Sequence, residues 1–181
     1  MKNIATFRLL NLTALTFGLL TTAPAPLRAD PCDGPRGKTE VTAYSDFSIV
    51  PANLGPYVIP GTDGDLYLHH VPLVGKFILT GKGVAIDGKV HVDLSGEMDA
   101  SGTGAVWFPT TVTATIGGVK TILFEGRGSA NEVNLVATGQ ISLTGRGPYE
   151  GMKLELTFRE IGPGDSNTFH HKGYLMPAPK N

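Results

Sequence analysis

Apolar and polar residues alternate along much of the chain after residue 40. The clearest segments are 89–98, 133–144 and 152–159, in which one set of alternate residues is mainly apolar and the other mainly polar. In the last of these, the apolar positions are Met152, Leu154, Leu156 and Phe158. A period of two residues is typical of antiparallel strands that bury one face and leave the other in water.

Turn sequences punctuate these segments. Asp87-Gly88 predicts a tight turn between strands 76–86 and 89–98, and Gly117-Gly118 predicts another between 110–116 and 119–125. Two further breaks, at 145–148 and 162–165, are expected to separate 133–144, 151–161 and 166–176. The short spacing leaves no room for crossover helices. We therefore predict an all-β fold, a single antiparallel β-barrel of about eight or nine strands, with a β-sandwich as the alternative.

The first residues have the pattern of an export signal. Lys2 and Arg8 supply a positively charged start, a mainly apolar run follows from Leu9 to Leu20, and small residues precede Asp30. We predict a signal peptide over 1–29 with cleavage after Ala29, and hence a periplasmic or secreted protein. An uncleaved membrane anchor is the alternative, although the apolar run is shorter than the ~20 residues of a comfortable span.

The rest of the chain divides into a flexible lead-in at 30–40, a β-barrel domain at 41–176 and a tail at 177–181. Cys32 is the single cysteine, so an exported chain has no internal disulfide. Asp30 and Pro31 do not suit a lipoprotein processing site, which favours an intermolecular disulfide or an idle thiol at Cys32.

Charge and composition exclude several classes of function. The chain is 17% charged, with 24 Gly and 13 Pro and a net charge of −1. Cleavage would remove Lys2, Arg8 and Arg28 and no acidic residue, which changes the net charge to −4. Basic residues do not cluster with aromatic ones, so we expect no nucleic-acid partner. Aromatic residues make up only 8% of the chain, which argues against a membrane barrel with aromatic girdles, and we expect no membrane span after cleavage.

Glycine-spaced segments carry a family resemblance. The turn at 144–151, Thr-Gly-Arg-Gly-Pro-Tyr-Glu-Gly, resembles the Gly-x-Gly-x-Tyr-x-Gly turn of small exported barrels of the allene-oxide-cyclase and dirigent-like type. The segment Phe124-Glu125-Gly126-Arg127-Gly128 is similar to their glycine-spaced strands. This resemblance covers roughly 30 residues. It implies an eight-stranded barrel with an interior cavity and implies nothing about chemistry.

Histidines are the first candidates for a metal site. They occur as His69-His70, His91 and His170-His171, and adjacent residues on a strand point to opposite faces, so each pair offers one ring to a given side. His69, His91 and His170 could together form a three-histidine site with an open position. The alternative, which we favour, is a set of histidines at the surface or the barrel rim.

Two more pairs are candidate ligand-binding residues. Asp93 stands two residues from His91 on the same face and could orient its imidazole, although such pairs also line ordinary polar surfaces. Trp107 and Phe108 form the most aromatic point and could stack on a ligand at a barrel end, or close that end as part of the core.

These observations favour a non-enzymatic exported barrel that binds a small apolar ligand or an envelope partner. The alternative is a cavity enzyme, either metal-dependent or cyclase- and isomerase-like, that uses His and Asp residues. The sequence leaves the catalytic residues unassigned, and we expect no cofactor.

Overall fold

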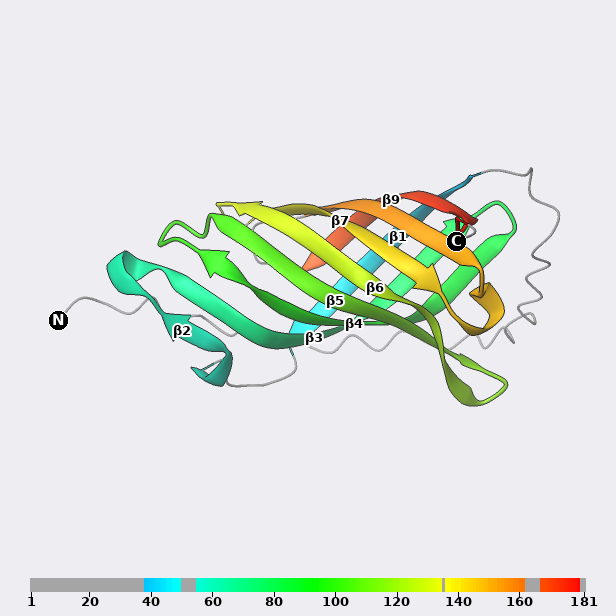
Figure 1. Cartoon of the computed structure of the whole chain (residues 1–181), viewed down its shortest axis with the longest axis horizontal. Helices are drawn as coiled ribbons and strands as arrows, with labels where there is room; N and C mark the ends of the chain where they lie inside the picture. Colours follow the sequence, from blue (N-terminus) through cyan, green and yellow to red (C-terminus); the bar gives the residue numbers. More distant parts are fainter. Residues whose placement is uncertain (1–37, 50–54, 135, 162–166, 180–181) are drawn as a thin grey trace, which may run out of the picture.

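The computed structural model describes residues 38–49, 55–134, 136–161 and 167–179 (Figure 1). The predicted signal peptide at 1–29, Cys32 and the predicted turn at 162–165 lie outside the described residues. No helix in the described part of the chain is long and apolar enough to cross a membrane.

Strands make up nearly all of the described chain. The first strands are β1 (Thr39–Ile49), β2 (Val58–Pro60), β3 (Leu66–Gly81), β4 (Val84–Met98) and β5 (Gly104–Ile116). They are followed by β6 (Val119–Val133), β7 (Val136–Gly145), β8 (Met152–Glu160) and β9 (Thr168–Pro177). Three one-turn 3-10 helices connect them: η1 (Gly55–Tyr57), η2 (Thr62–Gly64) and η3 (Gly147–Tyr149).

The sheet closes on itself. Each strand pairs antiparallel with its neighbours in the order β1-β9-β8-β7-β6-β5-β4-β3, and β1 also pairs with β3. This confirms the predicted antiparallel barrel, with eight strands in the wall, over the sandwich. The short strand β2 adds to the start of β3 outside the closed barrel, at the left in Figure 1.

The predicted turns had mixed outcomes. The turn at Gly117-Gly118 is confirmed, since both residues have positive φ between β5 and β6. The turn at Asp87-Gly88 was wrong, because these residues lie inside β4 and pair with Ile78 and Phe77 of β3. The chain turns instead at Lys82-Gly83, where Gly83 has φ 73°.

Gly88 has a different role from the one that a turn would give it. A Cβ atom at this position would collide with the carbonyl oxygen of Thr113 on β5. The missing side chain therefore allows two strands to approach closely, which is a second reason for glycine in a β-sheet. An Asp-Gly dipeptide can form a turn or can lie within a strand at a close contact, so the local sequence alone does not distinguish these two roles.

Of the other segments with clear alternation, 89–98 and 152–159 are confirmed as strand, whereas 133–144 is wrong at one end. The segment 152–159 lies within β8, as predicted. The segment 133–144 does not form one strand, because Asn134 has φ 51° and turns the chain between β6 and β7. Val133 is consequently the exposed end of β6, whereas Ala137, Ile141 and Leu143 on β7 are buried as the alternation predicts.

One half of the barrel interior is filled. Helix η3 places Tyr149 inside the end of the barrel, where its ring lies 4.8 Å from that of Phe124. Fully buried side chains surround this pair, among them Val41, Leu79, Val112, Leu143 and Leu154. The opposite half, toward the turns between β4 and β5 and between β6 and β7, is the part that positions the candidate site.

Candidate functional site

The second half of the barrel contains a cavity of about 230 Å³. Most of its lining is apolar and includes Val71, Val92, Leu94, Val106, Phe108 and Phe158. Two lining residues, Ala130 and Ala137, are small and stand on neighbouring strands β6 and β7. The polar side chains among the lining residues are those of Glu132, Asn167 and His171. The interior is therefore an apolar space with a few polar groups, which is the usual composition of a small-molecule site.

His171 is the most deeply buried of these polar groups. It points inward from β9 between Ala43 of β1 and Phe158 of β8, and its side chain is 3% exposed. Its Nε2 atom shares a hydrogen bond of 2.8 Å with the hydroxyl of Ser45, which is fully buried. Its Nδ1 atom is buried and has no hydrogen-bond partner among the described residues.

Burial also sets the protonation state of His171. Loss of water around the ring, and to a smaller extent the nearby His170, lower its pKa to about 4. The imidazole is therefore neutral at physiological pH. A neutral imidazole has one N–H donor and one lone-pair acceptor, so the unpartnered Nδ1 can serve a ligand in either role, depending on the tautomer.

Two carboxylates lie side by side near one end of this cavity. Glu132 on β6 pairs with Ala137 on β7, and Glu160 is the inward residue that follows Phe158 on β8. The N–H of Ala137 donates to Glu160 Oε2 at 3.0 Å, and the N–H of Asn167 donates to Glu160 Oε1 at 3.2 Å. Glu160 is buried, with only 8% of its surface exposed.

The pKa of Glu132 depends on its burial and on Glu160. Burial raises the pKa of its carboxyl group, and the negative charge of Glu160 raises it further. Opposite Glu132, β5 presents Gly104 and β7 presents Ala137, so Glu160 is the titratable group that faces it from the strands around it. Among the described lining residues, Glu132 thus supplies a carboxyl group whose pKa is raised.

The structure separates the two aromatic residues that the sequence singled out. Phe108 is 6% exposed and lines the cavity, whereas Trp107 is 57% exposed on the outer face of β5. Consecutive residues of a strand point to opposite faces, so they cannot act on one ligand inside the barrel.

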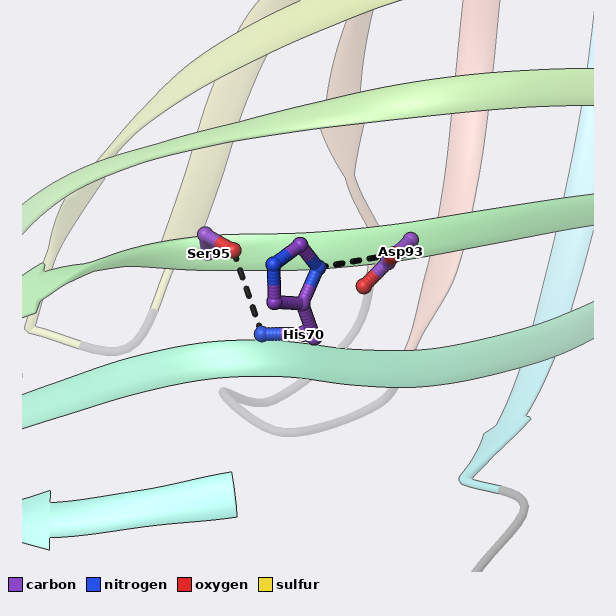
Figure 2. Close-up of polar contacts among 3 residues, drawn as sticks. All are labelled: His70, Asp93 and Ser95. Atoms are coloured by element: carbon purple, nitrogen blue, oxygen red, sulfur yellow. Dashed lines mark hydrogen bonds and ion pairs between the residues drawn. The ribbon is translucent and has the colours of Figure 1, made fainter.

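The candidate pair of His91 and Asp93 lies outside the barrel, on the outer face of β4. Asp93 does not orient His91 there, because Asp93 Oδ2 lies 2.9 Å from Nδ1 of His70 (Figure 2). The backbone N–H of His70 also donates to the hydroxyl of Ser95 at 3.1 Å. A shift in the pairing of β3 with β4 between Leu68 and Val71 brings His70 to this position.

This outer cluster has little chemical promise. His70 and Asp93 are 62% and 43% exposed, and exposed ion pairs contribute little to stability. Burial, with the charges of Lys120 and Lys89, lowers the pKa of His91, whose Nε2 has no hydrogen-bond partner among the described residues. Asp93 Oδ1 is likewise buried without a hydrogen-bond partner among the described residues, and a role of His91 and Asp93 in ligand binding stays a prediction.

The three candidate metal ligands, His69, His91 and His170, do not come together. No group of three or more His, Cys, Asp or Glu residues that could hold a metal ion occurs in the described ranges of the chain. His69 is exposed beside His70, and His170 is exposed on β9, where its ring makes a T-shaped contact with that of Tyr44. The reason is geometric: these rings extend from the outer wall at different strands.

Sequence reasoning missed Glu132, Glu160, His171 and Ser45. A signal was present in the alternation itself. Glu160 continues the apolar face of Leu154, Leu156 and Phe158 in steps of two residues. A polar residue in phase with the buried face is unusual because burial without a partner is costly. Such residues are better candidates than polar residues on a polar face.

Comparisons with protein-family models, with curated proteins and with solved structures found no match. The resemblance to allene-oxide-cyclase and dirigent-like barrels therefore stays a prediction.

Proposed function

We infer that this protein is an exported, non-enzymatic barrel that binds a small apolar or amphipathic ligand in its interior cavity. The sequence pattern of residues 1–29 supports export. The apolar lining of the cavity supports the class of ligand. A purely structural role in the envelope would not require a cavity in the barrel interior.

The observation that carries the proposal is the contrast between the cavity and close packing elsewhere. Protein interiors usually leave few voids larger than a water molecule. A dry cavity of roughly 150 Å³ lined by Leu, Ile and Phe is large enough to take up benzene. The cavity here is about 230 Å³, which suits a compact or short-chain apolar molecule somewhat larger than benzene.

The test replaces a small residue in the cavity wall by a larger one. Ala130 is buried and lines the cavity, so Ala130→Leu places additional methyl and methylene groups in the space that a ligand would use. Displacing about two methylenes of ligand corresponds to roughly tenfold weaker binding. Binding of 1-octanol, measured by isothermal titration calorimetry, should therefore weaken about tenfold in this variant.

A matched control adds the same side chain to the outer face. Ala105→Leu lies on the neighbouring strand β5, where Ala105 is exposed and pairs with Asn131. It should leave octanol binding unchanged. Absence of octanol binding in the unsubstituted protein, or equal effects of the two substitutions, would contradict a ligand site inside the barrel.

A second candidate function is an isomerase-like cavity enzyme. One observation favours it: a neutral histidine with a buried, unpartnered nitrogen and a carboxyl group of raised pKa line the same cavity. Groups of this kind can move a proton next to a carbonyl. Deuterium exchange of 2-octanone in D₂O tests it, since enzyme-catalysed exchange should be lost in both Glu132→Gln and His171→Gln. A rate equal to that of buffer would exclude this chemistry for the probe.

A further inference from the structure

Aromatic rings gather on one side of the cavity. The described lining residues of β1, β5, β8 and β9 include four phenylalanines and one histidine: Phe47, Phe108, Phe158, Phe169 and His171. The described lining residues of β2, β3 and β4 carry aliphatic side chains or, at Met98, a thioether. The cavity therefore has an aromatic wall and an aliphatic wall.

The rings of the aromatic wall contact one another across the strands. The ring centroids of Phe47 and Phe169 lie 5.8 Å apart, and those of Phe169 and Phe158 lie 5.5 Å apart, both in T-shaped contacts. The ring of Phe158 also lies 5.5 Å from that of His171 and 6.2 Å from that of Phe108, in tilted contacts. These spacings are those of favourable aromatic pairs, so the five rings form one connected cluster.

Two glycines of the barrel wall give this cluster its space. A Cβ atom at Gly128 would collide with the ring of Phe108, and one at Gly139 would collide with the ring of Phe158. The two glycines lie on the neighbouring strands β6 and β7. A side chain at either position would displace a ring, which is a reason for glycine inside a strand. The placement of the rings therefore depends on the sequence of β6 and β7 as well as on the phenylalanines themselves.

We propose that the ligand is a compact aromatic molecule that packs its ring against Phe108, Phe158 and Phe169. This inference rests on the proposed ligand-binding function. An aromatic ring that packs edge to face against another gains affinity beyond the burial of apolar area, whereas an alkyl chain gains the burial alone. Met98 on the aliphatic wall adds a sulfur atom, which contacts aromatic rings favourably. A cavity of roughly 150 Å³ takes up benzene, so the 230 Å³ here suits one ring with a short substituent.

The experiment compares two probes of matched shape by isothermal titration calorimetry: 2-phenylethanol and 2-cyclohexylethanol. The cyclohexyl ring is the more apolar of the two, so burial alone favours it. Each aromatic pair corresponds to about fivefold in affinity, and two such pairs exceed the difference in burial. We therefore expect 2-phenylethanol to bind about fivefold more tightly than 2-cyclohexylethanol.

The failure of this inference is distinguishable from the failure of the cavity function. Equal binding of the two probes, or tighter binding of 2-cyclohexylethanol, would overturn the aromatic ligand and leave a cavity that binds apolar molecules in general. Binding of 1-octanol without binding of either cyclic probe would have the same meaning. If none of the three molecules binds, the cavity function itself is wrong.

Two variants, one in each wall, locate the effect. Phe169 is partly buried and lines the cavity, so Phe169→Leu replaces a ring by an aliphatic side chain. The preference for 2-phenylethanol over 2-cyclohexylethanol should fall about fivefold in this variant. Leu73→Ile is the matched variant on β3, where it conserves volume in the aliphatic wall and should change the two affinities alike. Equal losses of preference in the two variants would overturn the contact with the ring cluster.

Nuclear Overhauser effects give a second measure that does not depend on the stability of a variant. In the complex of the unsubstituted protein with 2-phenylethanol, the ring protons of the ligand should show such effects with the ring protons of Phe158 and Phe169. Effects confined to the methyl groups of β3 and β4 would place the ligand against the aliphatic wall and overturn the proposal.

Discussion

The two halves of the barrel are built from the same strands but differ in the size of their inward-facing side chains. Toward η3, inward side chains such as Phe124, Leu143 and Leu154 fill the space and Tyr149 closes the end. Toward the β6–β7 turn, the inward positions of the same strands hold Ala130, Glu132 and Ala137 around a cavity. The comparison shows that closing a sheet into a barrel does not determine whether its interior is a core or a site. Side-chain volume at the inward positions decides this.

The largest expected difference between the halves comes from removing one aromatic ring from each. Phe124→Ala should lower the free energy of unfolding by about 3–5 kcal/mol, because the lost ring leaves a void in a closely packed region. Phe108→Ala should cost about 1 kcal/mol less, because part of that ring already faces the cavity and makes fewer contacts. Urea unfolding of both variants measures the difference. Equal losses would mean that the two halves are packed alike.

The next largest effect is expected in the pH dependence of stability, because His171 lies in the half that contains the cavity. The pKa of His171 is lowered from 6.5 to about 4, so between these values the unfolded chain binds a proton that the folded protein does not. The stability contribution of neutral His171 is therefore complete above pH 6.5 and is lost as the pH falls toward 4, by about 3 kcal/mol.

Substitution isolates this contribution from other titrating groups. In His171→Gln, the acid-induced fall in unfolding free energy should be smaller than in the unsubstituted protein by that amount. Glu132 works in the opposite sense, since its raised pKa favours the folded state at low pH, and it is present in both proteins. His69→Gln, which changes an exposed histidine, should keep the full fall. An unchanged fall in His171→Gln would show that His171 is not the group responsible.

A smaller difference should follow from adding one methyl group to each half. In Gly145→Ala, the new Cβ would meet the backbone carbonyl of Tyr149, which has little freedom to move, and the loss should be about 2 kcal/mol. In Gly128→Ala, the nearest atoms belong to the ring of Phe108, which can turn toward the cavity, and the loss should be about 1 kcal/mol.

Thermal unfolding and octanol titration of these two glycine variants test both expectations. Gly128→Ala should also weaken octanol binding, because Phe108 moves into the space of the ligand, whereas Gly145→Ala should leave the affinity of the folded protein unchanged. The reverse order of stabilities would indicate that the cavity wall is as rigid as the filled core.

Part of the fold could be predicted because it depends on local patterns. The alternation in 152–159 correctly placed Leu154, Leu156 and Phe158 on the inward face of β8. The turn at Asp87-Gly88 could not be separated from the one at Lys82-Gly83, because glycine serves both a turn and a close contact between strands. That choice depends on Thr113, which is distant in the sequence and adjacent in the sheet.

The candidate site was harder to predict because its members come from distant parts of the chain. Phe108 was singled out and does line the cavity, but its neighbour Trp107 faces away from it. His170 was chosen from its pair as a metal ligand, whereas His171 is the inward member of that pair. Which alternate residues of a strand face the barrel interior decides whether a residue can line the cavity. This orientation depends on the register of strand pairing.

The sequence by itself determined that this chain forms antiparallel strands joined by short turns, since alternation with a period of two predicts them, whereas the pairing of β1 with β3 decided for the barrel over the sandwich. It also determined the polar outer wall, because alternate residues of each strand must meet water. Only the tertiary structure decided that Ser45 meets His171, that Glu132 and Glu160 lie on either side of Ala137, and that one half of the interior stays open. The physical reason is that periodicity acts within a strand, whereas a site forms across strands, where closure and register bring distant residues together.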